Sequence, residues 1–218
     1  HFVRRRQRQM CIRDSRNISR IKKIGHAGTL DPLATGLLII CYGKYTKKIE
    51  SMQAQEKGYI GIFELGKTTP SFDLETAIDN EYPIDHITPQ FLKEKLELFR
   101  GDIKQVPPQF SAVKVNGKRA YEHARKGKKI ELKIRDTHIS KFEVDHSSFP
   151  TLKFKIQCAK GTYIRSLARD FGYAIDSGAY MSSLTRTSIG DYLLSDAVQI
   201  SDIRDTEDFF KFARQLSS

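Results

Sequence analysis

Residues 23–38 read KIGHAGTLDPLATGLL and hold the densest pattern in the chain. Three glycines and one proline surround a single histidine, His26, and a single aspartate, Asp31. Glycine and proline mark sharp changes of chain direction, and a glycine-rich backbone can approach a ligand closely. The pattern therefore predicts a tightly bent loop that presents a carboxylate. An aspartate before proline is by itself more often a turn or cap residue, so Asp31 has to be interpreted together with the whole loop.

The residues that follow predict strands and helices of ordinary length. Residues 37–42 form a short apolar run between two glycines, which indicates a buried strand leading into a lysine-rich helix at residues 45–53. Apolar side chains occupy both phases of residues 59–65, as in a strand that is covered on both faces. Residues 68–87 are rich in threonine, proline and acidic residues and predict an irregular excursion.

A helix is predicted from Pro89 to Arg100, with Thr88 as its N-cap and Gly101 as its stop signal. Residues 152–158 alternate strictly between apolar and polar side chains, which is typical of a strand with one solvated face. The other predicted elements are a strand at residues 110–115 with a turn at 116–117, a short helix at 121–125, two strands within 129–144, a helix at 163–175, a strand at 187–193 and a helix at 205–216. Helices and strands neither alternate regularly along the chain nor fall into separate blocks. We therefore expect an α+β fold with a mixed, mainly antiparallel sheet and flanking helices.

The charge of the chain indicates a polyanionic partner. The formal net charge is +11, and lysine or arginine placed against phosphate releases condensed counterions on binding. Residues 1–20 hold seven arginines and one acid, so this segment carries +6 and the rest of the chain carries +5. The segment has no apolar periodicity, and we interpret it as a non-native or disordered basic leader, with an RNA-binding arm as the alternative. Residues 21–218 are expected to form the catalytic domain.

Several classes of protein are disfavoured by what the sequence contains. The three cysteines are far apart and form no C-x-x-C pair, so we predict neither a disulfide framework nor a zinc site. We expect Cys41 and Cys158 to be core residues. This use of cysteine fits a protein of the reducing cytoplasm. The longest apolar run has six residues, whereas a membrane span needs about 20. No nucleotide-binding glycine fingerprint is present. We therefore expect no cofactor, no metal and no membrane association.

Residues 23–38 resemble the G-H-x-G-x-L-D-P-x-A-x-G-x-L motif of the TruB family of tRNA pseudouridine synthases at every defined position. The resemblance continues in the same order along the chain, with PPQFSAVK at residues 107–114 and CAKGTYIR at residues 158–165 among the matching blocks. Further blocks lie at residues 55–66, 99–103, 117–125 and 178–187. A match of this length and order implies the pseudouridine synthase fold.

The resemblance implies that the chain converts uridine to pseudouridine in the T-loop of tRNA, at position 55, without a cofactor. Asp31 occupies the position of the family's catalytic carboxylate, which attacks C1′ of the nucleotide or assists formation of a glycal. Arg165 occupies the position of its counter-charge, which would keep the carboxylate ionised. Without the resemblance, Arg165 would be read as a surface arginine at the unfavourable end of a helix dipole.

The family pattern also assigns residues that bind the substrate. A uridine in a folded loop has to leave its stack before it can react, and aromatic side chains can then hold the base. By motif position, Tyr59 would stack on the base, Tyr163 and Leu184 would line the pocket, and His26 would contact the RNA or support the loop. Packing in the core is the alternative for the two tyrosines and the leucine, and a structural role is the alternative for the histidine. Among the many lysines near these motifs, Lys23, Lys47 and Lys160 are predicted as a group to bind phosphates.

The sequence departs from the family pattern in three places. No K-P-x-G-x-T-S segment precedes Ile21, so we expect an N-terminal truncation; Thr185 stands where the family has the first arginine of an L-R-R string; and residues 67–73 differ from the usual R-T-D-T-x-D string. The 26 residues after Tyr192 are too few for a complete C-terminal RNA-binding domain of PUA type. Two alternatives stay open: a catalytically silent protein that binds and folds tRNA, and a synthase of the same fold that acts on another RNA. We expect a monomer that binds the T-arm of tRNA and does not bind DNA.

Overall fold

The computed structural model describes residues 15–111, 113–115, 117–124 and 130–215. The chain divides into two units: unit 1 comprises residues 1–57 and 185–218, and unit 2 comprises residues 58–184. Two long strands, β4 (Lys57–Leu65) and β12 (Ala179–Ile189), contain points at which the chain passes from one unit to the other.

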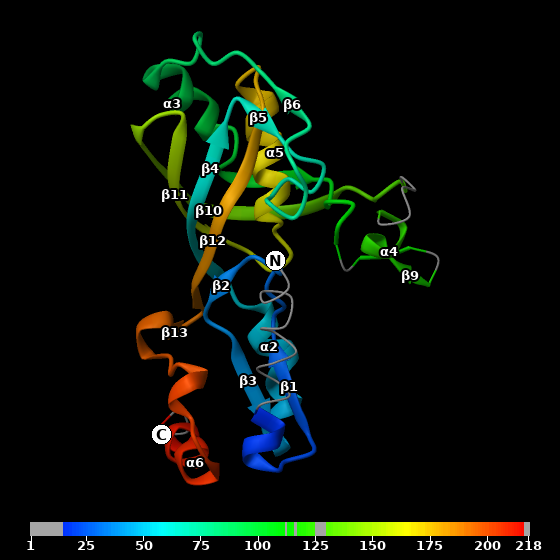
Figure 1. Cartoon of the computed structure of the whole chain (residues 1–218), viewed down its shortest axis with the longest axis vertical. Coiled ribbons are helices and arrows are strands. Elements are labelled where there is room, and N and C mark those ends of the chain that lie inside the picture. Colours follow the sequence, from blue (N-terminus) through cyan, green and yellow to red (C-terminus); the bar gives the residue numbers. More distant parts are fainter. Residues whose placement is uncertain (1–14, 112, 116, 125–129, 216–218) are drawn as a thin grey trace. The chain divides into compact units, whose positions relative to one another are not determined.

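Unit 2 is built on a twisted sheet whose strands follow the order β12-β4-β11-β10-β7 (Figure 1). The strands not yet bounded are β7 (Gly101–Gln105), β10 (Arg135–Ser148) and β11 (Thr151–Cys158). The pairs β10–β11 and β10–β7 are antiparallel. In β11 the predicted alternation is confirmed, because Leu152, Phe154, Ile156 and Cys158 are buried whereas Lys153 and Lys155 are exposed.

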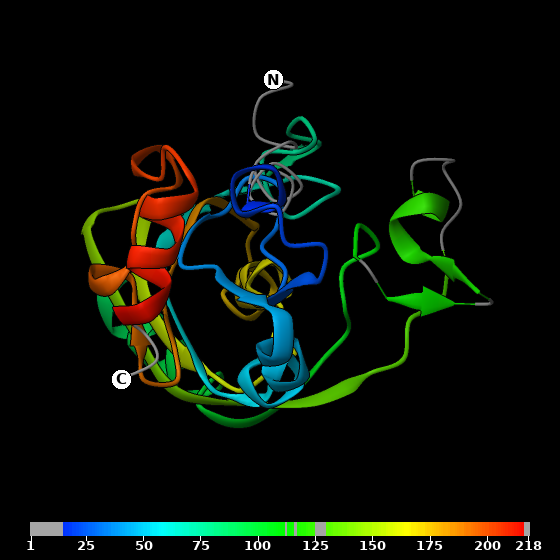
Figure 2. The same cartoon turned by 90° about the horizontal axis from the view of Figure 1, so that it is seen from below.

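Unit 2 has two longer helices, α3 (Pro89–Glu97) and α5 (Ile164–Ala174), which contact each other, and α5 packs on the buried face of the sheet. Both views place α5 on the concave side of the strands (Figures 1 and 2). Phe171 of α5 joins an aromatic cluster in which its ring centroid lies 6.5 Å from Phe63 and 6.1 Å from Phe142, while Phe63 and Phe154 are 4.3 Å apart. This cluster lies in the core of unit 2, and it fixes α5 against the sheet through Phe171 in the second half of the helix.

Local sequence signals predicted both helices well. The Thr88 hydroxyl accepts a hydrogen bond from the backbone N–H of Phe91 at 3.2 Å, and Pro89 is the first residue of α3, so the predicted N-cap is confirmed. The helix ends at Glu97, before the predicted Arg100. The predicted helix at 163–175 corresponds to α5.

The prediction that residues 68–87, between β4 and α3, are irregular is also confirmed in large part. It contains only the short strands β5 (Lys67–Thr68) and β6 (Asn80–Glu81), paired with each other. Farther along the chain, β8 (Lys114–Val115), β9 (Lys118–Arg119) and α4 (Ala120–Ala124) project from the rest of unit 2 (Figures 1 and 2). The strand predicted at 110–115 is therefore reduced to its last two residues; Ala112, Asn116 and Arg125 lie outside the described residues.

The prediction of two strands within residues 129–144 is wrong. One long strand, β10, begins at Arg135, and residues 130–134 form no strand. Ile139 and Phe142 are both fully buried although they are three residues apart, because the register with β11 shifts between Ile139 and Lys141. A bulge of this kind interrupts the period of two, so that one bent strand looks like two in the sequence. The partner of the first part of β10 is β7, which no prediction contained.

Unit 1 contains the antiparallel hairpin of β1 (Ile24–Ala27) and β3 (Ile39–Tyr42), with β2 (Thr35–Gly36) between them in the chain. After β3 come a 3-10 helix, η2 (Gly43–Lys48), and α2 (Ile49–Ala54), which lies along β1 and β3 (Figure 1). The buried strand predicted at 37–42 thus starts two residues later, and the predicted helix at 45–53 is two consecutive helices.

The C-terminal part of unit 1 differs from the predicted single strand at 187–193. The end of β12 turns at Gly190 and pairs with β13 (Tyr192–Leu193) as a hairpin. The positive φ of Gly190, 51°, permits this turn. The short 3-10 helices η3 (Leu194–Asp196) and η4 (Ile200–Asp202) follow, and α6 (Thr206–Gln215) confirms the predicted terminal helix, whose residue 216 lies outside the described part.

The two ends of the described chain pack together in unit 1. Residues 15–19 are helical, and the Thr206 hydroxyl donates to the carbonyl of Ile18 at 2.7 Å. Tyr42 of β3 meets Phe209 of α6 edge to face at 5.5 Å. Residues 1–14 of the predicted leader lie outside the described residues. In the part of the chain that is described, no helix combines the length and the apolar composition that a membrane crossing requires.

Candidate active site

Asp31 lies in the loop that joins β1 to β2 in unit 1, and its side chain is half-buried. The backbone N–H of Ala34 donates to the carbonyl of Asp31 at 3.0 Å, so Asp31 begins a turn. Gly28, near the start of the loop, has a φ of 88°, a value that side-chain-bearing residues rarely adopt. The loop is therefore as sharply bent as the sequence predicts.

The far end of this loop is anchored to β12. β2 pairs in parallel with the end of β12, with Thr35 opposite Thr185 and Gly36 opposite Arg186. The backbone N–H of Leu37 donates to the carbonyl of Arg186 at 2.9 Å. A Cβ atom on Gly36 would lie 2.3 Å from the carbonyl oxygen of Arg186, and the φ of Gly36 is 99°. Glycine is therefore required at this position for two independent reasons.

The other predicted residues of unit 1 surround the same hairpin. His26 is half-buried on β1 opposite Ile40, and its carbonyl accepts from the side-chain amide of Gln53 at 3.4 Å. Lys23 is exposed just before β1, and its carbonyl accepts from the N–H of Gly43 at 2.9 Å. Lys47 is exposed in the last turn of η2.

Arg165, in the first turn of α5 in unit 2, is 2% exposed. Its Nε lies 3.6 Å from Oδ2 of Asp73, which is 1% exposed, and its Nη2 donates to the carbonyl of Phe110 at 3.1 Å. A buried guanidinium needs such a counter-charge, and all the more so near the positive end of a helix dipole. This burial excludes the alternative of a surface arginine, and the predicted pairing of Arg165 with Asp31 stays a prediction.

Asp73 was missed in the sequence because it lies in the irregular segment, where no periodicity marks a buried residue. Asp73 is the last residue of the stretch 67–73, whose sequence differs from the family pattern. Its surroundings are polar: the hydroxyls of Thr69 and Ser71 donate to its carbonyl, and its Oδ1 accepts from the N–H of Glu75. These bonds hold the carboxylate in place beside the arginine.

Tyr163 immediately precedes α5 and is half-buried. Gln105, a buried residue at the end of β7, binds its backbone on both sides: the N–H of Tyr163 donates to Oε1 at 3.0 Å, and Nε2 donates to the carbonyl of Tyr163 at 3.3 Å. Nothing in the sequence distinguished Gln105 from other glutamines. Lys160 is exposed in the turn between β11 and α5.

Tyr59 and Leu184 lie on the neighbouring strands β4 and β12 of unit 2. Tyr59 is half-buried and Leu184 is buried. Of the nine predicted site residues, unit 1 holds Lys23, His26, Asp31 and Lys47, and unit 2 holds Tyr59, Lys160, Tyr163, Arg165 and Leu184.

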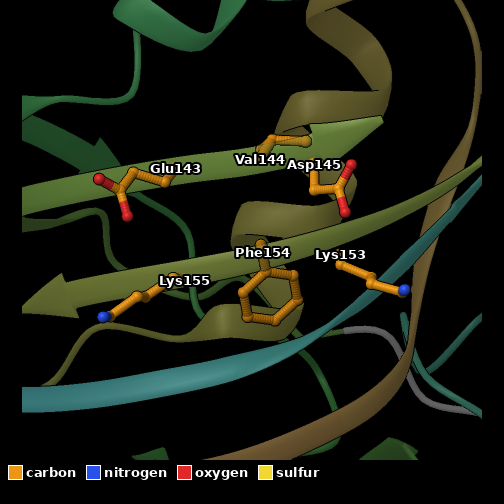
Figure 3. Close-up of a pocket in the computed structure, with 6 residues that line it drawn as sticks. All are labelled: Glu143, Val144, Asp145, Lys153, Phe154 and Lys155. Carbon is orange, nitrogen blue, oxygen red and sulfur yellow. The ribbon is translucent and has the colours of Figure 1, made fainter. Parts of the chain in front are cut away.

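A pocket of about 290 Å³ lies elsewhere in unit 2, on β10 and β11 (Figure 3). Its charged side chains form cross-strand pairs, Glu143 opposite Lys155 and Asp145 opposite Lys153. A hydrogen bond from Lys141 lowers the pKa of Glu143 below its usual range. Exposed pairs of opposite charge contribute little to the stability of the fold. None of the predicted site residues lines this pocket. We interpret it as the solvated face of the sheet.

The described residues form neither a metal-binding cluster nor a reactive thiol. Within those ranges, no three His, Cys, Asp or Glu side chains are grouped so as to hold a metal ion. Cys41 and Cys158 are buried, which confirms their predicted place in the core. Burial also raises the pKa of the Cys41 thiol, which disfavours the reactive thiolate.

Comparison with known proteins gives a family. Residues 16–164 match the model of the N-terminal domain of TruB family pseudouridylate synthases. The chain belongs to this family. The family, the isomerase class and the fold that the sequence predicted are thereby confirmed.

Relatives in several bacteria support the same assignment. This TruB family member is 54% identical over 179 residues to the tRNA pseudouridine synthase B of Flavobacterium johnsoniae, a match that covers 82% of the chain and 78% of the relative. The enzyme of the same name in Phocaeicola vulgatus is 53% identical, with 82% and 76% covered, and that of Clostridium tetani is 39% identical, with 89% and 67% covered.

Solved structures show the same fold. A chain of a Cbf5–Nop10–Gar1 complex superposes with a TM-score of 0.68 at 23% identity, and a chain of an H/ACA RNP bound to a substrate RNA containing 2′-deoxyuridine superposes with a TM-score of 0.66 at 21% identity. Each match covers 97% of this TruB family chain. The chain spans about half the length of these solved chains, 53% and 52%.

The tight approach at Gly36 leads to a prediction about the Asp31 loop. We expect Gly36→Ala to lower the free energy of unfolding by at least about 3 kcal/mol, because the overlap with the Arg186 backbone adds to the strain of the positive φ. Gly43→Ala is the matched control: its φ is also positive, 55°, but nothing lies within 4 Å of the added Cβ. The control should cost about 1–2 kcal/mol. Urea denaturation of both variants measures the difference, and equal losses would contradict the close approach.

Proposed function

We propose that the chain isomerises uridine to pseudouridine in the T-loop of tRNA, at position 55, with Asp31 as nucleophile and without a cofactor or metal. The observation that carries this proposal is the Asp31 loop: the complete fourteen-residue motif is present at residues 25–38, and the loop is bent and anchored to β12. The names of the bacterial relatives, tRNA pseudouridine synthase B, support tRNA as the substrate.

The isomerisation breaks the bond between C1′ of the ribose and N1 of the base and forms a bond between C1′ and C5. The carboxylate of Asp31 attacks C1′ or assists formation of a glycal, and the detached uracil turns before it bonds again. The proton on C5 leaves to solvent, and N1 ends with a proton. No electrons are exchanged with another molecule, so a carboxylate and a pocket that retains the base supply what the reaction needs.

Arg165 is proposed to keep Asp31 ionised. Its burial supports this role, because a guanidinium in a low-dielectric environment acts on a nearby carboxylate more strongly than it would in water. Asp73 and the carbonyl of Phe110 hold the guanidinium plane in one orientation. A guanidinium that is held in one plane offers its N–H groups in fixed directions, as an oriented counter-charge requires.

Tyr59, Tyr163 and Leu184 are proposed to hold the uracil, with His26 supporting the extruded nucleotide or its loop. The half-buried state of both tyrosines supports this assignment, because a ring that is packed on one side keeps a surface for a base. The two hydrogen bonds from Gln105 fix the backbone of Tyr163 and so limit the motion of its ring.

Lys23, Lys47 and Lys160 are proposed to bind phosphates of the T-arm. All three are exposed, as a phosphate contact requires. The predicted monomeric state, the cytoplasmic location and the boundary of the leader remain predictions.

The central test replaces Asp31 by asparagine. We expect Asp31→Asn to abolish tritium release from tRNA labelled at C5 of uridine, while tRNA binding stays within about twofold, because the amide has the same shape but is not a nucleophile. Asp191→Asn, at an exposed aspartate of unit 1, is the matched control and should keep full activity.

An active Asp31→Asn variant would refute the assignment. If the unmodified protein binds tRNA but releases no tritium, the silent tRNA binder is the better description. Release from ribosomal RNA but not from a T-arm stem-loop would favour a synthase for another RNA.

Stacking of the base on Tyr59 can be tested separately. We expect Tyr59→Ala to weaken binding of a T-arm stem-loop about 5- to 150-fold, which corresponds to about 1–3 kcal/mol of stacking free energy, whereas Tyr59→Phe should bind normally. Tyr173→Ala, at a tyrosine of α5 that is 62% exposed, is the control. Filter binding measures all three, and normal affinity and turnover of Tyr59→Ala would show that the ring is only packing.

The lysine group is testable through the salt dependence of binding. Replacing Lys23, Lys47 and Lys160 together by glutamine should reduce the slope of log K against log salt by about 2 to 3, since each lost phosphate contact reduces it by about 0.7–0.9. The control replaces Lys141, Lys153 and Lys155, the exposed lysines on and beside the sheet face of Figure 3. Equal slopes for the two triple variants would exclude a specific role for the first group.

A further inference from the structure

Arg186 is the largest fully buried side chain among the described residues, with 1% of its surface exposed. It lies in the part of β12 that belongs to unit 1. A guanidinium that is removed from water is strongly destabilising unless its donors are satisfied, so its hydrogen-bond partners indicate why this position holds an arginine.

Two of its partners are the two ends of the loop that carries Asp31. Nη2 of Arg186 donates to the carbonyl of Gly28 at 3.1 Å, and Nε donates to the carbonyl of Leu37 at 2.8 Å. The backbone of Arg186 adds a third connection, because its carbonyl accepts from the N–H of Leu37. One residue thus closes residues 28–37 at their base.

The glycine at the start of the loop fits the same arrangement. A Cβ atom on Gly28 would lie 3.4 Å from Nη1 of Arg186, a contact at the limit of ordinary packing. Gly28 has a positive φ, 88°, and its carbonyl accepts from Nη2 of Arg186 at 3.1 Å. The guanidinium and both ends of the loop are therefore fitted to each other.

The rigid geometry of arginine matters for this role. Its donors form a planar fork, so two carbonyls that bind to it are held at a fixed separation. A lysine ammonium in the same place could bind either carbonyl but would not set the distance between them. Loops of this length are otherwise among the most mobile parts of a protein.

We propose that Arg186 is a positioning residue for the reaction: it sets the separation of Gly28 and Leu37 and thereby the place of the Asp31 carboxylate. This proposal rests on the proposed function of Asp31. A misplacement of a reacting group by about 1 Å can reduce the rate about 100-fold, so replacement of the Arg186 guanidinium should reduce kcat. KM should stay near its normal value, because the proposed phosphate contacts are made by exposed lysines elsewhere.

The test compares Arg186→Lys with the unmodified protein, and Arg204→Lys, the same change at an exposed arginine of unit 1, is the control. Three quantities are measured: kcat and KM from tritium release with T-arm stem-loop RNA, the dissociation constant of that RNA, and amide hydrogen exchange of a peptide that covers residues 28–38. We expect Arg186→Lys to lower kcat about 10- to 100-fold, to change KM and the dissociation constant less than threefold, and to speed exchange in this peptide at least tenfold. The control should change none of these.

Two results overturn the proposal: a normal kcat with normal exchange in the loop, or a general loss of protection that lowers kcat and RNA affinity together. If Arg186→Lys does not fold, Arg186→Gln is used, since it leaves no buried charge and keeps one amide donor; the same fall in kcat with normal affinity is required. If neither variant folds, Arg186 is a determinant of the fold and the positioning role is rejected. Failure of the proposed function is recognised separately, because an active Asp31→Asn variant would remove the role of Asp31 while the exchange result for the loop would stand.

Discussion

The hydrogen-bonded junction between the Asp31 loop and the end of β12 is the constraint on which unit 1 depends. A carboxylate that is to attack a sugar carbon, as we propose for Asp31, has to be held within a few tenths of an ångström, yet Asp31 lies in a loop, the least constrained kind of structure. The junction resolves this conflict. Gly36 permits backbone contact with Arg186, and the buried guanidinium binds the carbonyls of Gly28 and Leu37, so that the loop is held by a strand. The glycines of the motif are needed because they let the chain bend and come close at these points.

A second buried arginine organises unit 2. Arg165 lies in the first turn of α5, where the helix dipole disfavours a cation, and Asp73 compensates from a segment without regular structure. The aromatic cluster around Phe63 and Phe171 fixes α5 on the sheet, and Gln105 fixes the residue before it. Burial of charge next to a rigid core is expected where a protein needs an oriented cation more than it needs stability.

The sequence was sufficient for features that are encoded locally. The N-cap at Thr88, the alternation in β11 and the bent loop around Asp31 each depend on residues that are close together in the chain, and all three are present. Features that depend on contacts between distant residues were not predictable in this way. Asp73 is 92 positions from Arg165, and Arg186 is about 150 positions from the carbonyls that it binds, so neither pairing leaves a periodic signal. The bulge in β10 was not predictable for a related reason, because the period of two is informative only while the register with the partner strand is regular.

In the proposed reaction, Asp31 is the group that meets the sugar of an extruded uridine. The most direct measurement is a crystal structure of the Asp31→Asn protein bound to a T-arm stem-loop. We expect the target uridine to be out of its stack, with its C1′ beside the side chain of residue 31 and its base against the ring of Tyr59. A uridine that remains stacked in the loop, or a ribose held far from residue 31, would contradict it.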